Sequence, residues 1–147
     1  MQNVEEILNE HFTPALAKTT KLVFERGEGP YLYTTDGKKY LDYVSGIAVN
    51  ALGHCHPKIV AAVKEQAEKL IHASFNLGSY PSALNLAQKL AEYTPGDLNM
   101  FFFSNSGAEA VEGALKLARY RTQRPAYIAF KGSFHGRTMG ALSMTAS

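Results

Sequence analysis

The sequence predicts an α/β protein in which a small antiparallel sheet is followed by a strand–helix–strand unit. Early in the chain, short runs of Val, Tyr, Phe and Thr partly alternate with polar residues and are separated by Gly, Pro and Asp, which is typical of paired strands. The segment from Phe101 to Phe130 begins and ends in apolar runs of strand length, with helical periodicity between them. This order is typical of a sheet covered by helices.

The composition is that of an ordinary globular chain. Its 147 residues are 46% hydrophobic and 19% charged, and the net charge of +2 comes without a block of like charges, so no nucleic-acid partner is predicted. No long apolar run or secretory signal is present, so no membrane partner is predicted either. The single cysteine, Cys55, excludes an internal disulfide and favours the cytoplasm as the location.

The first elements are a helix and a hairpin-rich sheet. A short helix is predicted over Asn3–Phe12, with Asn3 as its cap. Asp36-Gly37 lies between two strand-like runs and is a strong hairpin signal. We interpret the sheet as structural. Its predicted strands are Leu22–Arg26, Tyr31–Thr35 and Lys39–Val44.

A glycine-punctuated connection, Ser45–Pro57, follows the sheet. It contains His54, Cys55 and His56, but adjacent side chains on an extended backbone point apart, and the spacings of common zinc sites are absent. No metal site is therefore predicted. Cys55 lacks the local signature of a nucleophile and is expected to be a packed or partly buried thiol.

Two helices are predicted next, each opened by a proline at the first helical position, over Pro57–Ile71 and Pro81–Tyr93. The apolar residues of the first recur at helical spacing, so this stripe is expected to be buried. The stripe consists of Ile59, Val63, Ala67, Leu70 and Ile71.

The most informative stretch comes next. Phe101–Phe103 and Ala126–Phe130 are predicted to be buried strands, because both are short and continuously apolar. Between them, Ser106 and Glu109 have the spacing of a capping box, which marks the start of a helix. Later in that helix, Glu112 and Lys116 lie one turn apart on the polar side, in the favourable order for an ion pair.

The start of this helix is suited to an anion. The first N–H groups of a helix lack partners within it and carry partial positive charge, and Gly107 and Ala108 have little side chain to block a phosphate. The loop Lys131–Arg137 is expected to reach the same edge of the sheet and offers an aromatic ring, an imidazole and two cations. The alternative is that Ser106 only caps the helix and nothing binds.

Three segments together resemble the class III, pyridoxal-5′-phosphate-dependent aminotransferases. They are SNSGAEAVEGALKLAR, AFKGSFHGRT and SGIAVNALGHCHP, and the last is closest to the acetylornithine/ornithine branch. The resemblance spans nearly the whole chain. It implies the N-terminal portion of the fold-type I transferase fold, with an N-terminal segment over residues 1–56 and the start of the cofactor-binding αβα domain over residues 57–147.

The resemblance also implies where the cofactor and substrate bind. The backbone at Gly107 and Ala108 holds the phosphate of pyridoxal 5′-phosphate, and the Phe134 ring stacks on the pyridine ring. Ile47 and Asn50 lie near the substrate. The implied cofactor-binding residues are Ser106, Gly107, Ala108, Phe134 and His135.

The implied reaction transfers an amino group from an ω-amino donor, of the acetylornithine, ornithine or 4-aminobutyrate type, to 2-oxoglutarate, in a homodimer. In the family, the Schiff-base lysine, the aspartate that pairs with the ring nitrogen and the main arginine lie downstream of the SFHG loop. No lysine here matches the family's lysine motif, and Lys131 is expected to be a solvated loop residue. The isolated chain is therefore predicted to contain no catalytic residue and to be inactive. The alternative is a non-catalytic protein that binds phosphate or the cofactor, or that pairs with a full-length homologue.

Overall fold

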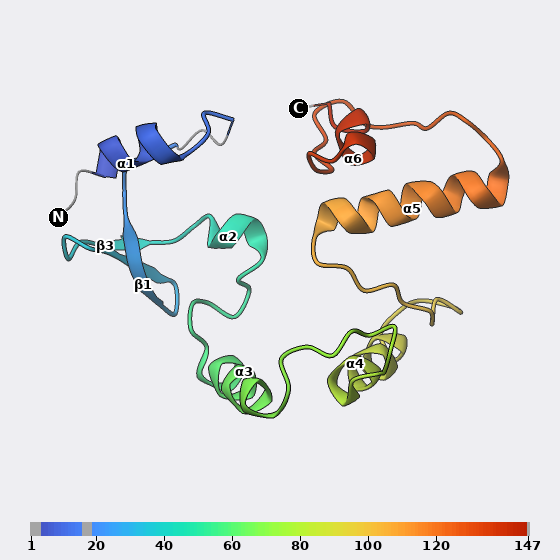
Figure 1. Cartoon of the computed structure of the whole chain (residues 1–147), viewed down its shortest axis with the longest axis horizontal. Coiled ribbons are helices and arrows are strands. Elements are labelled where there is room, and N and C mark those ends of the chain that lie inside the picture. Colours follow the sequence, from blue (N-terminus) through green and yellow to red (C-terminus); the bar gives the residue numbers. More distant parts are fainter. Residues whose placement is uncertain (1–3, 16–18, 147) are drawn as a thin grey trace. The chain divides into compact units, whose positions relative to one another are not determined.

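The structure, a computed structural model, describes residues 4–15 and 19–146. The chain divides into two compact units, Met1–Ala73 and Ser74–Ser147, whose elements are labelled in Figure 1. The domain boundary between residues 56 and 57 stays a prediction.

The first unit contains a helix, α1, and a three-stranded antiparallel sheet in the order β1-β2-β3. In its register, Leu32 is opposite both Gly27 and Tyr40. The predicted helix and the three predicted strands are confirmed, while the predicted cap Asn3 lies outside the described residues. The bounds are α1 Val4–His11, β1 Phe24–Glu28, β2 Tyr31–Thr34 and β3 Lys39–Leu41.

The predicted Asp36-Gly37 hairpin is also confirmed. Gly37 has a φ of +82°, which glycine adopts without steric cost, and its N–H donates to the Thr34 carbonyl at 2.9 Å. The buried Thr34 hydroxyl donates to Asp36, which also accepts from the Lys38 ammonium at 2.7 Å. Lys38 and, to a smaller extent, Thr34 lower the pKa of Asp36 to about 2.

A one-turn element, α2 (Ser45–Ala48), and the helix α3 (Pro57–Lys69) complete the first unit. Pro57 opens α3 as predicted, but the apolar stripe is not buried: Val63 is 63% exposed and Ile71 is 86% exposed. No described helix or strand packs against α3. The periodicity of the stripe predicted a helix correctly, whereas its burial requires a covering element that the described residues do not supply.

The second unit contains α4 (Pro81–Ala91), α5 (Gly107–Thr122) and α6 (Met139–Ser143). α4 begins at the predicted proline, and α5 begins directly after Ser106, as the capping box predicts. α5 and α6 pack together, and Ala141 of α6 is fully buried. None of the described helices combines the length and the apolar character needed to cross a lipid bilayer.

The two strands predicted on either side of α5 are wrong as strands. Residues 101–103 and 126–130 form no β-ladder, and Ile128 is 95% exposed. Both segments nevertheless contact α5. A Cβ at Gly113 would lie 3.2 Å from the Phe102 ring, and the Tyr127 hydroxyl donates to the Leu115 carbonyl at 2.6 Å. A strand requires hydrogen bonds from a neighbouring strand, and the described residues place none beside either segment.

Candidate functional site

The N-terminus of α5 is fixed by its own side chains. The Ser106 hydroxyl accepts a hydrogen bond from the Glu109 N–H at 3.2 Å. The Glu109 carboxylate accepts from the Asn105 N–H at 2.7 Å, one residue further back than in the usual capping box. Ser106 has an extended backbone, with φ −150° and ψ 159°, as expected of a residue that precedes a helix. The first turn of α5 is therefore capped by residues of the chain itself.

Two N–H groups at this end remain available. Those of Gly107 and Ala108 have no hydrogen-bond acceptor among the described residues. A Cβ at Gly107 would meet nothing within 4 Å, so the space beside this residue is open. Unpaired N–H groups at a helix start carry partial positive charge. The arrangement fits a phosphate group.

The loop before α6 packs directly on this turn. A Cβ at Gly136 would lie 2.6 Å from the Cβ of Ala108 and 3.1 Å from that of Ala141. The φ of Gly136 is +129°, a value suited only to glycine. Since Phe134 and His135 immediately precede Gly136, this contact brings the two predicted parts of the cofactor site together at the capped end of α5.

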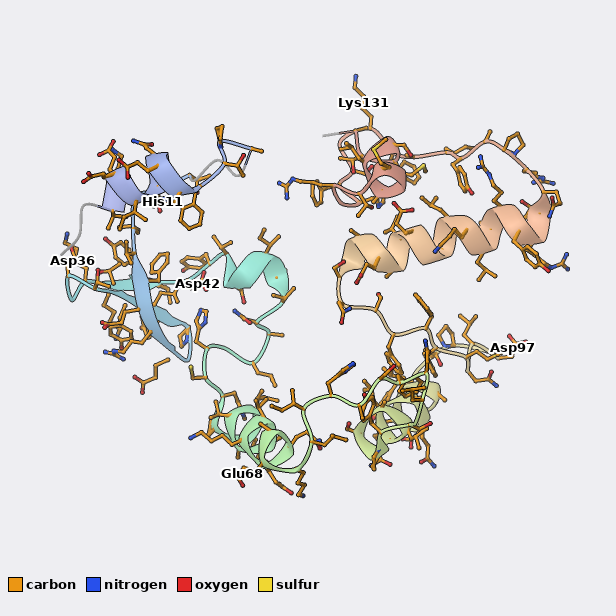
Figure 2. All side chains as sticks on the ribbon, viewed as in Figure 1. His11, Asp36, Asp42, Glu68, Asp97 and Lys131 are labelled. Carbon is orange, nitrogen blue, oxygen red and sulfur yellow. The ribbon has the colours of Figure 1, made fainter. Side chains whose placement is uncertain are left out.

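The side chains of the loop are accessible to a ligand. Phe134 is 57% exposed, and His135 is partly buried. The Arg137 guanidinium lies 5.2 Å from the centre of the Phe134 ring, within cation–π distance. Lys131, the other cation of the loop, extends away from it (Figure 2). Ring, imidazole and guanidinium therefore occur within four residues of the loop that contacts Ala108.

Glu112 has a different partner from the one predicted. Its ion pair with Lys116 is not formed; instead, its carboxylate accepts from the Gly140 N–H at 2.8 Å and the Ala141 N–H at 3.3 Å. The Thr138 hydroxyl, then these N–H groups, lower the pKa of Glu112, and Lys116 adds a smaller attraction. The partners lie 28 and 29 residues along the chain, so helix periodicity could not indicate them.

A groove of about 360 Å³ adjoins this contact, because Glu112 and Gly140 both belong to its lining. Its lining includes Arg119, Tyr127 and Ser143. None of the predicted cofactor-binding residues lines it. The groove therefore has no part in the candidate site.

The predicted substrate-proximal residues, Ile47 and Asn50, belong to the first unit. Ser45, Ile47 and Ala48 have φ values of +51°, +63° and +63°, so α2 is a left-handed turn. Left-handed backbone costs roughly 1–2 kcal/mol for each residue other than glycine. The turn is closed by hydrogen bonds, including Asn50 N–H to the Ser45 carbonyl at 3.0 Å, and Ile47 is 85% exposed.

A buried carboxylate supports this turn. Asp42, with a side chain only 7% exposed, accepts from the N–H groups of Val44 and Ser45 at 2.9 Å each. It also pairs with the His54 ring nitrogen Nε2 at 2.7 Å. The Ser45 N–H and then the His54 ring lower the pKa of Asp42. Figure 2 shows Asp42 where the chain passes from β3 to α2.

Cys55 differs from its prediction. Its side chain is exposed, not packed or partly buried. Cys55 has a φ of +52° and lies between a bridge at His54, which pairs with Gly29, and the start of α3.

Comparisons with known proteins agree with these features. The sequence profile of the family described as aminotransferase class-III matches residues 13–147. Acetylornithine aminotransferase of Archaeoglobus fulgidus is 55% identical over 125 residues, covering 85% of this chain and 32% of that protein. A probable 4-aminobutyrate aminotransferase of Bacillus subtilis is 48% identical over 121 residues, covering 82% and 28%. The chain thus spans about a third of the length of these relatives.

Solved structures show the same fold. An adenosylmethionine-8-amino-7-oxononanoate aminotransferase from Methanocaldococcus jannaschii has a TM-score of 0.85 and 36% identity, over 97% of this chain and 35% of that one. An ω-transaminase from Thermomicrobium roseum has a TM-score of 0.87 and 33% identity, over 98% and 35%. The predicted fold, part of the fold-type I transferase fold, is confirmed, and enzymes of this class depend on pyridoxal 5′-phosphate. With its match over residues 13–147, the chain belongs to the class III aminotransferases.

Proposed function

We propose that this chain supplies the phosphate- and ring-binding part of a transaminase that uses pyridoxal 5′-phosphate. The observation that carries the proposal is the contact of Gly136 with Ala108, which brings the 133–137 loop to the open N-terminus of α5. A ligand with an aromatic ring and a phosphate requires both features at one place. Neither a helix cap alone nor an exposed aromatic alone would favour it.

Each residue of the proposed site has a separate role. The N–H groups of Gly107 and Ala108 donate to the phosphate, and Ser106 keeps them aligned by capping α5. Phe134 would supply an aromatic face for the cofactor ring, and His135 would lie in the same pocket. When bound, pyridoxal 5′-phosphate supplies an electron sink for the carbon that carries the amino group.

The proposed donor is an ω-amino compound, and the proposed acceptor is 2-oxoglutarate. The relatives named after acetylornithine and 4-aminobutyrate support this class, because both compounds carry the reacting amine at the end remote from a carboxylate. Ile47 and Asn50 are proposed to lie near this substrate, and the complete protein is proposed to act as a homodimer.

The 147-residue chain alone is proposed to bind the cofactor without catalysing transfer. An aminotransferase holds its cofactor through a lysine Schiff base, and the lysine nearest the loop, Lys131, extends away from it (Figure 2). The second candidate is a non-catalytic protein that binds phosphate or the cofactor reversibly, or that pairs with a full-length homologue. It is favoured by the same open site.

Titration of the 147-residue chain with pyridoxal 5′-phosphate, followed by the absorbance and induced circular dichroism of the cofactor, tests the site. Gly107→Val fills the open space and is expected to abolish binding, whereas Gly78→Val, at an equally open glycine of the same unit, should not. Phe134→Ala should weaken binding about three- to tenfold by removing a stacking contact. Phe130→Ala, an aromatic that is 84% exposed, is its control.

Inorganic phosphate should compete with the cofactor if the helix end holds the phosphate. Borohydride should fix no stoichiometric lysine adduct in this chain. Equal binding by Gly107→Val and wild type would contradict the proposed site. The mass of the protein in its source cells, by blot with an antibody to this segment, then separates the candidates: a species much heavier than 16.1 kDa favours the transaminase, and one at 16.1 kDa favours the binding protein.

A further inference from the structure

We infer that Glu112 and Thr145 are positioning residues that hold the 133–137 loop against the N-terminus of α5. The purpose of this arrangement, alignment of the ring- and phosphate-binding groups, rests on the proposed function. The holding itself rests on contacts within one unit of the chain. Neither residue belongs to the proposed set of cofactor-binding residues.

Glu112 attaches the loop at its C-terminal side. It lies one turn after Ala108 on α5, so it shares the face on which Gly136 packs. Its carboxylate accepts from the N–H groups of Gly140 and Ala141, in the first turn of α6. These groups have no partner within so short a helix, and a carboxylate is the strongest acceptor available to them. Glu112 is thus a helix cap supplied by another helix.

Thr145 holds the loop through hydrogen bonds to its backbone. Its hydroxyl oxygen accepts from the His135 N–H at 3.1 Å, and its proton is directed to the carbonyl of Ala141 at 2.9 Å or of Gly136 at 3.2 Å. A single side chain therefore holds the His135 N–H and has the carbonyls of Gly136 and Ala141 as alternative acceptors for its proton. Valine has the same shape but neither bond.

The backbone closes the rest of the loop. The Gly132 N–H donates to the Ala146 carbonyl at 2.8 Å, and the Ala146 N–H donates to the Ser133 carbonyl at 3.0 Å. The segment from 132 to 146 is thereby a closed loop whose ends meet. Glu112 is the group that ties this closed loop to α5 by hydrogen bonds, and it does so beside the Ala108 contact. Fixed geometry of this kind lowers the entropy lost when a ligand binds.

Residue-resolved amide hydrogen exchange on the 147-residue chain tests the inference directly. Glu112→Ala is expected to accelerate exchange at Gly140 and Ala141 about tenfold or more, because a charge-assisted hydrogen bond is lost. Glu112→Gln keeps an acceptor oxygen and should preserve most of the protection. Lys116→Ala, which removes a charge from the same helix without a bond to α6, is the matched control.

A second pair of variants tests the loop at the His135 amide. Thr145→Val should accelerate exchange at His135, and Thr145→Ser, which keeps the hydroxyl, should restore it. Pyridoxal 5′-phosphate affinity should fall about tenfold in Glu112→Ala and Thr145→Val and stay within about threefold in the two conservative variants. Exchange in α4 should not change, which distinguishes loosening of the loop from unfolding of the unit.

The outcomes separate the two proposals. Unchanged exchange at all three amides in Glu112→Ala and Thr145→Val would overturn the positioning role, whether or not the cofactor binds. If the variants show the expected exchange effects but the wild-type chain does not bind the cofactor, the proposed site is overturned and the positioning role stands. If Glu112→Ala unfolds the unit, the comparison of Thr145→Val with Thr145→Ser decides, and equal rates at His135 would overturn the inference.

Discussion

Position 136 accepts only glycine, for two separate reasons. Its φ of +129° is unfavourable for any side chain, and an added methyl would lie 2.6 Å from the Cβ of Ala108. Gly136→Ala is therefore expected to destabilise the second unit by about 2–4 kcal/mol, combining backbone strain with overpacking. Urea unfolding of the chain measures the loss.

Gly132→Ala is the control for that substitution. Gly132 also has a positive φ, +82°, but a Cβ there would meet nothing within 4 Å. Only backbone strain should remain, at about 1 kcal/mol. If the two substitutions cost the same free energy of unfolding, packing of the loop on α5 contributes nothing and the described contact is wrong.

Asp42 should make the stability of the first unit depend on acid. Its pKa in the folded chain lies below its ordinary value of 3.8, so its stabilising effect is complete above that pH and is lost as the pH falls through the lowered value. Asp42→Asn removes this titration. The difference in urea midpoint between wild type and Asp42→Asn should therefore stay constant above pH 5 or so and shrink below about pH 4. A constant difference down to about pH 2 would exclude the described hydrogen bonds.

Side-chain partners were the least predictable feature at this scale. The bond between Asp42 and His54 spans 12 residues, and Glu112 reaches residues 28 and 29 positions away. Sequence patterns detect neighbours on one helix or strand, which is why helical spacing pairs Glu112 with Lys116 instead. The capping bond from Ser106 to Glu109 was predictable because both residues belong to one turn.

Among the elements, α5 allows helix stability and anion binding to be separated. Ser106→Ala removes the cap and should destabilise the helix by about 1 kcal/mol. Ser106→Asp keeps a good cap but places a negative charge beside the proposed phosphate position, so it should preserve thermal stability while weakening cofactor binding. Circular dichroism melting and cofactor titration measure the two effects. Parallel losses in both variants would argue that the site depends only on helix order.

Helices could be predicted from the sequence more completely than strands. The prolines at positions 57 and 81 and the cap at Ser106 mark helix starts by local chemistry, and the structure begins α3, α4 and α5 there. The runs at 101–103 and 126–130 have strand composition, but a strand exists only as part of a pair. Composition predicts buried strands at both places, which is wrong because the described residues supply no partner strand.

For the whole molecule, the exposed stripe of α3 has a practical consequence. Apolar side chains at Ile59, Val63 and Ile71 are in contact with solvent, and contiguous exposed apolar surface promotes association. The chain is expected to self-associate as its concentration rises, as measured by sedimentation velocity. The double variant Val63→Lys/Ile71→Lys should shift the distribution toward the monomer.

The matched control changes the polar face of the same helix. Lys64→Ala/Glu68→Ala removes two charges of opposite sign and leaves the stripe intact, so association should persist. Equal reduction by both double variants would show that the stripe is not the cause. Family membership could be predicted from the sequence because its motifs are local and cover nearly the whole chain. The burial of α3 could not, because it requires a covering element, and no described helix or strand packs against α3.

The left-handed turn at Ser45–Ala48 has a stereochemical consequence. Positive φ values at Ser45, Ile47 and Ala48 are those that residues of the D configuration prefer. If the chain were assembled by chemical ligation, D-alanine could be placed at position 48. It would remove the backbone strain that L-alanine has at this positive φ. Mirror-image building blocks thus offer a way to lock the proposed substrate-side turn while leaving its side-chain chemistry unchanged.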